Sequence, residues 1–304
     1  MPVKDKTRAS ARPKGRAGII GLGTMGGAFA RNLVKAGWEV TGFDVSAPAR
    51  KAARAAGVAI ADNAAALAAN CPVIITSLPD PAALHETVAA LAAAARKPRI
   101  VVETSTLALD DKMAAERALR AAGHVMLDCP VSGTGAQART GDIVIYASGE
   151  RAAIRKLRRL FADFAREAPD LGAFGNGSRM KYVANLLVAI HNVASAEAMV
   201  FGMKAGLDPD QIIRLVRTGA GNSRIFELRA PMMARNSYDQ ATMKMALWQK
   251  DMNIISALAR EIGTPTPLLD ATQNIYALAL ADGRGAQDTA AVCAVLEKAA
   301  GLKR

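Results

Sequence analysis

Lys181 shares one face of a long predicted helix with three small polar residues. In the segment 175–206, Gly175 and Gly177 form an expected opening loop, Ser178 is the expected N-cap and Gly206 the expected end, and the helix between these caps contains no breaker except Gly202. At about 100° per residue, positions +4, +11 and +14 return to within about 40° of the direction of Lys181; they hold Asn185, Asn192 and Ser195. An amine beside an amide on an otherwise apolar helix is a candidate for moving a proton. The alternative is a solvated lysine in the first turn.

That helix must be positioned by the elements before it. At about 1.5 Å per residue it would be roughly 40 Å long, enough to run from one domain into another. Upstream, the turn Gly21-Leu22-Gly23-Thr24-Met25-Gly26 follows an expected strand at 17–20 and opens a helix that ends near residue 36. The glycines of such a turn permit a tight bend, the approach of a pyrophosphate and close helix packing, and the helix N-terminus attracts phosphate. The alternative is a glycine-rich turn without a ligand.

Asp44 closes the next expected strand, 39–43. A carboxylate there would accept hydrogen bonds from the adenosine ribose and repel a 2′-phosphate. The cofactor expected is therefore NAD, with NADP less favoured.

Alternation of strands and helices continues and predicts an α/β fold with a doubly wound parallel sheet. Ligands bind beyond the carboxyl ends of strands in such sheets. Leu78-Pro79 and Ser105-Thr106 lie at two such ends and are candidate contacts, although either hydroxyl can instead cap a helix. The expected strands are 58–60, 73–78, 99–103 and 124–127, and the expected helices are 63–69, 82–95 and 107–122.

A loop of small residues, 128–142, leads from one strand end into an expected strand at 143–148. Amides freed by Gly133 and Gly135, with the hydroxyls of Ser132 and Thr134, form a candidate carboxylate site. A tight hairpin-like connection is the alternative. A helix near 150–166 and a weak strand at 171–174 should follow, and later helices are expected at 208–218, 224–234, 242–262, 267–281 and 287–300.

The composition argues against several classes of protein. Of the formal net charge of +12, residues 1–16 contribute about five by count, and the mildly basic remainder shows no clustered basic face with stacking aromatics for nucleic acid. No uncharged apolar run approaches the roughly 20 residues of a membrane span. Cys71, Cys129 and Cys293 are odd in number and far apart, which favours a reducing, cytoplasmic setting. The three histidines lack metal-binding spacing, so no metal is expected.

Four stretches, in order, carry a resemblance to a known family. They are GLGTMGGAFARNL, DCPVSGTGAQARTGD, GNGSRMKYVANLL and KDMNIISALA. From about residue 17 onward the sequence resembles the β-hydroxyacid dehydrogenases, which include 3-hydroxyisobutyrate dehydrogenases and tartronate semialdehyde reductases. Residues 1–16 lie outside the resemblance, and their basic, nearly apolar-free composition predicts a disordered leader. The resemblance implies a Rossmann-like NAD-binding domain at 17–175 and an all-helical domain at 176–304 through which dimers or tetramers form.

The resemblance also implies roles for individual residues. The glycine turn binds the dinucleotide, and Ser132–Thr134 contacts the carboxylate of a small substrate. Lys181 is catalytic, Asn185 helps to place the substrate, and Lys250 reaches the cofactor side of the cleft. The expected reaction is the reversible NAD-dependent oxidation of a 3-hydroxyisobutyrate-like acid to its semialdehyde or 3-oxo acid, with Lys181 as general acid and base. Burial and the positive nicotinamide ring should lower the lysine pKa from about 10.4.

Three positions depart from the usual family pattern. Thr134 replaces a glycine, Gln137 replaces a small residue, and Ala184 replaces an asparagine. The first two are consistent with a more hydroxylated substrate, so tartronate semialdehyde reduction and threonate-like sugar-acid oxidation stay open as alternatives. A non-catalytic dinucleotide-binding interaction module and an imine reductase are further alternatives, but their typical members lack this lysine. Nucleic-acid binding by the leader would fall steeply with salt.

Overall fold

The computed structural model describes residues 13–94 and 96–303 and contains two compact units. One unit comprises the described residues up to Ser105 together with Leu109–Gly177; the other comprises Thr106–Ala108 and the residues from Ser178 onward. Most of the expected leader, 1–16, lies outside the described residues.

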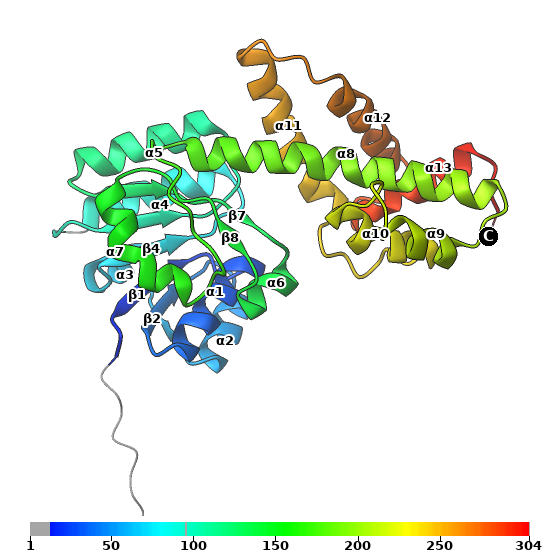
Figure 1. The fold of residues 1–304 in the computed structure, drawn as a ribbon. Coiled ribbons are helices and arrows are strands. Elements are labelled where there is room, and N and C mark those ends of the chain that lie inside the picture. The colour runs from blue at the N-terminus through cyan, green and yellow to red at the C-terminus, as the bar shows by residue number, and fades with distance from the viewer. Residues whose placement is uncertain (1–12, 95, 304) are drawn as a thin grey trace, which may run out of the picture. The chain divides into compact units, whose positions relative to one another are not determined.

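The N-terminal unit is built on a parallel sheet of six strands in the order β3-β2-β1-β4-β5-β6 (Figure 1). The chain leaves β1 toward β2 and β3 on one side and returns to β4, β5 and β6 on the other, so the strand order reverses next to β1. A ligand is expected at such a switch point. The strands are β1 (Arg16–Ile20), β2 (Glu39–Phe43), β3 (Ala59–Ile60), β4 (Val73–Thr76), β5 (Ile100–Glu103) and β6 (Val125–Asp128).

Helices connect these strands and bury the apolar faces of the sheet. Phe29 and Leu33 of α1 are fully buried in the same core cluster as the strand residues Ile19, Ile75 and Val102. Runs such as the fully buried VIIT of β4 are typical of strands covered on both faces. The predicted doubly wound fold is confirmed. The helices are α1 (Thr24–Lys35), α2 (Ala47–Ala55), α3 (Ala64–Asn70), α4 (Pro81–Ala94), α5 (Leu109–Ala121) and α7 (Arg151–Ala162).

Local structure differs from expectation in three places. Helix α2 was not predicted, although Ser46 caps it by accepting a hydrogen bond from the Ala49 amide. The loop expected at 128–142 contains β7 (Val131–Ser132) and α6 (Gly135–Thr140), and the following strand shrinks to β8 (Val144–Ile145), antiparallel to β7. The strand expected at 171–174 is wrong, because these four residues form no strand or bridge; the nearest isolated bridge joins Ala147 to Asp170.

The sequence-level view that no basic face is present also needs correction. Exposed cations line α7 without an intervening acid: Arg151, Arg155, Lys156, Arg158 and Arg159. Arg151 pairs with Asp170 at 3.0 Å, so part of this charge is balanced locally.

The second unit is helical, as predicted. Its longest element, α8 (Asn176–Lys204), starts two residues before the expected N-cap Ser178, which is instead buried within the first turn. The helix stops before Gly206, whose φ of +88° suits glycine. The others are α9 (Pro209–Val216), α10 (Arg224–Ala234), α11 (Met245–Glu261), α12 (Pro267–Ala281), η1 (Thr289–Ala291) and α13 (Val292–Ala299).

The three small residues of the polar stripe on α8, the face that carries Lys181, Asn185, Asn192 and Ser195, are buried. Asn192 donates to the Tyr276 hydroxyl at 2.7 Å and to the Thr289 carbonyl at 2.9 Å, and Ser195 donates to the carbonyl of its own helix at His191. By length and hydropathy alone α8 is one helix that could cross a membrane. The contacts of Asn192 join α8 to α12 and η1 within the helical unit.

Candidate active site

The glycine turn after β1 has the geometry that a dinucleotide needs. Gly21 has a φ of +88°, and a Cβ there would lie 2.1 Å from the Ser77 carbonyl oxygen. A Cβ at Gly26 would lie 1.9 Å from the Gly21 carbonyl oxygen, so this glycine allows α1 to pack against the turn. A Cβ at Gly23 would meet no atom within 4 Å. The open side of the turn is therefore at Gly23, beside the exposed Thr24, where phosphate would approach the N-terminus of α1.

Asp44 lies at the end of β2, beside this turn. Its carboxylate accepts hydrogen bonds from the Leu22 amide at 2.6 Å and from the Ser46 amide at 2.7 Å. Each oxygen keeps further acceptor capacity. The carboxylate is thus fixed at the position where a ribose diol would be expected.

Two further predicted contacts lie at the carboxyl ends of neighbouring strands. The β1, β4 and β5 ends are in register, because Ile20 pairs with Thr76 and Thr76 with Glu103. Ser105 is buried, and its hydroxyl accepts a hydrogen bond from the Leu78 amide at 2.8 Å. Ser105 therefore supports the loop after β4, which Leu78 and the exposed Pro79 form.

The loop predicted to bind a carboxylate lies against the glycine turn. A Cβ at Gly135 would be 2.3 Å from the Thr24 Cγ2, and Asn32 of α1 donates to the Ala138 carbonyl of α6 at 2.9 Å. Gly133 has a φ of +140°. Within the described residues, the hydroxyl of the half-buried Ser132 forms no hydrogen bond.

Thr134 and Gln137 have a local role that the sequence did not reveal. The Thr134 hydroxyl accepts from the Gln137 amide while the Gln137 side chain accepts from the Thr134 amide, which forms a capping box at the start of α6. The Gln137 side chain also donates to Asp142 at 3.2 Å. Because these groups satisfy one another, neither residue indicates a more hydroxylated substrate.

Lys181 lies in a compact ionic cluster within the helical unit. Asn185, one turn further along α8, is buried and donates to Asp251 of α11 at 2.9 Å. Asp251 also pairs with Lys250 at 3.0 Å. Burial is the main cause that lowers the pKa of Lys181 to about 8; Asp251 opposes this shift and Lys250 adds to it. The amine therefore exchanges protons near neutral pH.

The segment Thr106–Ala108 leaves the sheet directly after β5 but belongs to the helical unit. Lys250 donates a hydrogen bond to the Thr106 carbonyl, and the Tyr182 hydroxyl donates to the Leu107 carbonyl at 2.6 Å. Both side chains thus hold a segment that is continuous with Ser105.

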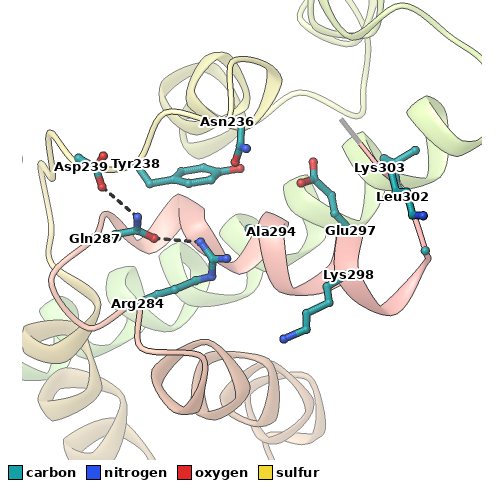
Figure 2. A pocket seen from close by; sticks show the side chains of 11 residues that line it. Asn236, Tyr238, Asp239, Arg284, Gln287, Ala294, Glu297, Lys298, Leu302 and Lys303 are labelled. Carbon is teal, nitrogen blue, oxygen red and sulfur yellow. Dashed lines mark hydrogen bonds between the residues drawn. The ribbon is translucent and has the colours of Figure 1, made fainter.

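The hollow shown in Figure 2 contains none of the predicted site residues. It is lined by the segments that follow α10 and α12 and by α13 with the residues after it, and two of its polar contacts are made by Gln287, which bridges Asp239 and Arg284. Over residues 13–94 and 96–303, no group of three acidic, histidine or cysteine side chains is placed to hold a metal ion.

Comparisons with known proteins agree with this geometry. The NAD-binding domain of 6-phosphogluconate dehydrogenase matches residues 16–175, and the NAD-binding domain of NADP-dependent 3-hydroxyisobutyrate dehydrogenase matches residues 175–296. The chain is 34% identical to L-threonate dehydrogenase of Cupriavidus necator over 90% of this chain and 94% of that one. The chain belongs to the β-hydroxyacid dehydrogenase family.

Other relatives show the breadth of this family. Glyoxylate/succinic semialdehyde reductase 2 of Arabidopsis thaliana is 26% identical, over 93% of this chain and 79% of its own. The structure of 3-hydroxyisobutyrate dehydrogenase of Mycobacterium tuberculosis with L-serine is 28% identical, with a TM-score of 0.85 over 92% of this chain and 98% of that one. This β-hydroxyacid dehydrogenase family member is a dinucleotide-binding oxidoreductase with the Rossmann-like and all-helical architecture predicted from its sequence.

Sequence reasoning missed some of the residues around the site. The sequence shows Asp251 only as the residue after Lys250 in the stretch KDMNIISALA, yet it accepts a hydrogen bond from Asn185 and acts on the Lys181 pKa. Glu103, Lys112 and Asp128 were not singled out. The sequence feature that could have identified them is an acidic residue at the end of each of two successive buried strands, Glu103 and Asp128.

Proposed function

We propose that this enzyme reversibly oxidises a small 3-hydroxyacid to its semialdehyde or 3-oxo acid, with NAD as the preferred cofactor. The observation that carries the proposal is the Lys181 amine, with a pKa lowered to about 8, one helical turn from Asn185. A group with that pKa is half protonated near pH 8, so it can both accept and donate a proton close to neutral pH.

The residues of the N-terminal unit fit a dinucleotide. The Gly23 backbone would admit the pyrophosphate, and Asp44 would bind the adenosine ribose and disfavour a 2′-phosphate. When bound, the nicotinamide supplies the acceptor for the hydride that leaves the hydroxyl-bearing carbon.

The remaining steps fall to side chains of this chain. Ser132, Gly133 and the amides around Thr134 would hold the substrate carboxylate. Asn185 would hold the hydroxyl oxygen without adding charge, and neutral Lys181 would take the hydroxyl proton as the C–H bond breaks. In the reverse direction the Lys181 ammonium would return that proton to the carbonyl oxygen.

The substrate has two leading candidates. A 3-hydroxyisobutyrate-like acid is favoured by the family model over 175–296 and by the similar mycobacterial structure. L-Threonate is favoured by the higher identity to the Cupriavidus enzyme. Tartronate semialdehyde, in the reductive direction, is a third candidate that the sequence suggested.

Initial rates with NAD and with NADP test this proposal. The panel is 3-hydroxyisobutyrate, L-threonate, glycerate, serine, 3-hydroxypropionate and 4-hydroxybutyrate, with tartronate semialdehyde and NADH for reduction. Lys181→Met should lower kcat by about 10²–10⁴-fold, the usual contribution of a positioned acid–base group, and leave the Kd for NAD within about twofold. Turnover of the variant near the wild-type rate would remove Lys181 from the mechanism. A kcat/KM that favours NADP would overturn the assignment of Asp44.

The enzyme's setting is part of the proposal: a cytoplasmic homodimer or homotetramer whose partner is a small carboxylate, without nucleic acid or membrane. Val183 and Leu187 on α8 are about half exposed and Phe201 is 79% exposed, so this helix presents apolar surface for a second copy to cover. Light scattering after size exclusion should give at least twice the 31.8 kDa chain mass; a monomer would contradict it.

A further inference from the structure

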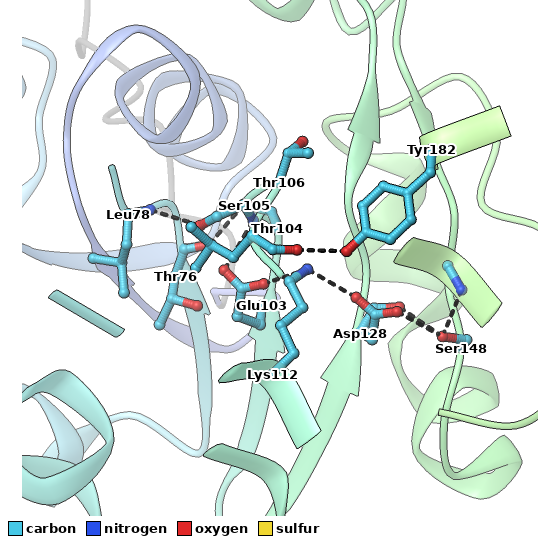
Figure 3. Close-up of polar contacts among 12 residues, drawn as sticks. Thr76, Leu78, Glu103, Thr104, Ser105, Thr106, Lys112, Asp128, Ser148 and Tyr182 are labelled. Carbon is cyan, nitrogen blue, oxygen red and sulfur yellow. Dashed lines mark hydrogen bonds and ion pairs between the residues drawn. The ribbon is translucent and has the colours of Figure 1, made fainter. Parts of the chain in front are cut away.

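Two carboxylates lie side by side at the carboxyl end of the sheet (Figure 3). Glu103 ends β5 and Asp128 ends β6, and the two residues are partners in the strand register. Register partners point to the same face, and like charges placed that way repel. Lys112 of α5 lies between them, 2.6 Å from Glu103 Oε2 and 2.8 Å from Asp128 Oδ1. All three side chains are 0% exposed.

Lys112 stays charged in this position. Burial alone would lower its pKa, but the charges of Asp128 and Glu103 outweigh burial and raise the pKa above the usual lysine value. An ammonium group with three donors can therefore brace two strand ends and a helix at one point.

One side of this buried triad leads to the loop after β4. The second carboxylate oxygen of Glu103 accepts a hydrogen bond from the Ser105 amide at 2.9 Å. The Ser105 hydroxyl in turn accepts from the Leu78 amide. Glu103 thus orients the residue that supports a predicted dinucleotide contact.

The other side leads to the first turn of α8. Ser148 is fully buried; its hydroxyl donates to the Asp128 carbonyl at 3.0 Å and lies 3.3 Å from Asp128 Oδ2. The same hydroxyl accepts from the Gly177 amide at 2.9 Å. Gly177 has no room for a side chain, because a Cβ would be 2.2 Å from the Tyr146 carbonyl oxygen. The amide is one of the four at a helix start that lack a partner within the helix.

We propose that Lys112 is a positioning residue that holds the Leu78 amide, through Ser105, and the Gly177 amide, through Ser148, in one rigid frame. Lys181 follows Gly177 by four residues, about one turn, in the same helix. The triad therefore sets both the loop on the cofactor side and the start of the helix that carries the amine. This inference rests on the proposed role of Lys181.

Stability alone is a poor explanation of the triad, because removing three charged side chains from water costs free energy. This favours a positioning role. Buried ion pairs often give no more stability than apolar residues of similar volume. In some proteins buried ionic groups fix geometry instead, and a displacement of about 1 Å in an active site can lower turnover by about 10²-fold.

The test uses the full-length enzyme and separates the two branches of the network. Ser105→Ala should raise the Kd for NAD about fivefold, as expected for one lost hydrogen bond, with kcat within twofold. Ser148→Ala should lower kcat at saturating NAD and substrate about tenfold or more, with the Kd for NAD within twofold. Lys112→Met should produce both effects. Hydrogen exchange should accelerate at the Leu78 amide in the first variant and at the Gly177 amide in the second, whether or not substrate is turned over.

Matched variants serve as controls. Arg229→Met removes another buried ion pair, Arg229–Asp288 at 2.7 Å in the helical unit, and should lower Tm without changing either the Kd for NAD or kcat. Ser148→Thr keeps the hydroxyl and should recover kcat. If Lys112→Met does not fold, Ser105→Ala and Ser148→Ala still test the two branches of the network.

Serine variants that only lower Tm, with unchanged kcat, Kd and local exchange, would overturn the proposal. A Lys181→Met variant that keeps its turnover would instead contradict the proposed function, while the Kd and exchange data still report on the network. The two failures are therefore distinguishable.

Discussion

At the scale of single residues, the ionic cluster around Lys181 governs its protonation. Asp251 and Lys250 are adjacent in the sequence and act on the Lys181 amine in opposite directions. Neither is a proton carrier in the proposed mechanism, so each can be altered to tune the amine.

The pH dependence of the reaction should follow this amine. Neutral Lys181 accepts the hydroxyl proton, so kcat/KM for oxidation should rise with pH through about 8, and reduction should fall over the same range. Asp251→Asn removes a charge that raises the pKa, so the midpoint should move to lower pH. Lys250→Met removes a charge that lowers it, so the midpoint should move to higher pH. Rate profiles between pH 6 and 10 measure both; shifts in the same direction would contradict the assignment.

The sequence predicted candidate site residues better than it predicted the hydrogen-bond partners of those residues. A lysine and an amide four residues apart were visible in the sequence, and so was the acid after β2. The capping box of Thr134 and Gln137, and the use of Asn192 to join α8 to α12 and η1, depend on contacts from distant segments. Helical periodicity predicts which residues share a face but not what they contact. The polar stripe therefore contains Asn192, which has a structural role, as well as the candidate pair Lys181 and Asn185.

At the scale of elements, the glycine turn separates packing from ligand binding. Gly26 is needed because α1 lies against the Gly21 carbonyl, whereas Gly23 faces open space. One motif therefore contains a structural glycine and a glycine with a proposed binding role.

Two alanine substitutions should separate these roles. Gly26→Ala puts a Cβ 1.9 Å from a backbone oxygen and should lower the free energy of unfolding by about 1–3 kcal/mol or more. Gly23→Ala has an ordinary φ of −66° and no neighbour within 4 Å, so stability should change by less than about 0.5 kcal/mol. Its Kd for NAD should nevertheless rise tenfold or more, because the methyl group would fill the phosphate approach. Denaturant unfolding and NAD titration measure both, and unchanged NAD affinity in Gly23→Ala would argue against this phosphate site.

Most strands and helices could be predicted because their signals are local. Strand β2 and helices α10 and α12 have the expected bounds. The misses were short: α2 is small and mostly exposed, α6 depends on a capping box inside a loop of small residues, and residues 171–174 are too irregular to pair as a strand. Such segments are fixed by tertiary contacts rather than by propensity.

At the scale of the whole molecule, the chain has two cores made from different segments. One core cluster draws on the sheet and its helices, and the other on α8 to α13. The predicted dinucleotide contacts, except Thr106 and Lys250, lie in the first unit.

Dinucleotide binding should therefore protect the two units unequally. Binding stabilises the native state by about 2.7 kcal/mol when NAD is at 100 times its Kd. Amides of the β1–α1 turn and of the loops after β4 and β5 should gain the most protection in hydrogen exchange, while those of α10, α12 and α13 should change little. Exchange with and without NAD, resolved by peptide, measures this. Equal protection throughout the described chain would contradict the assigned binding site.

The short segment Thr106–Ala108 gives the molecule an unusual connectivity. The segment belongs to the helical unit, whereas the residues on either side of it belong to the unit with the sheet. The polypeptide therefore passes between the units three times, after residues 105, 108 and 177. A cut after residue 177 would consequently not release an intact Rossmann-like unit, because the carbonyls of Thr106 and Leu107 would lose the hydrogen bonds that Lys250 and Tyr182 donate to them. Anyone transplanting or recombining this unit with another helical partner must carry over those two side chains or redesign the tripeptide.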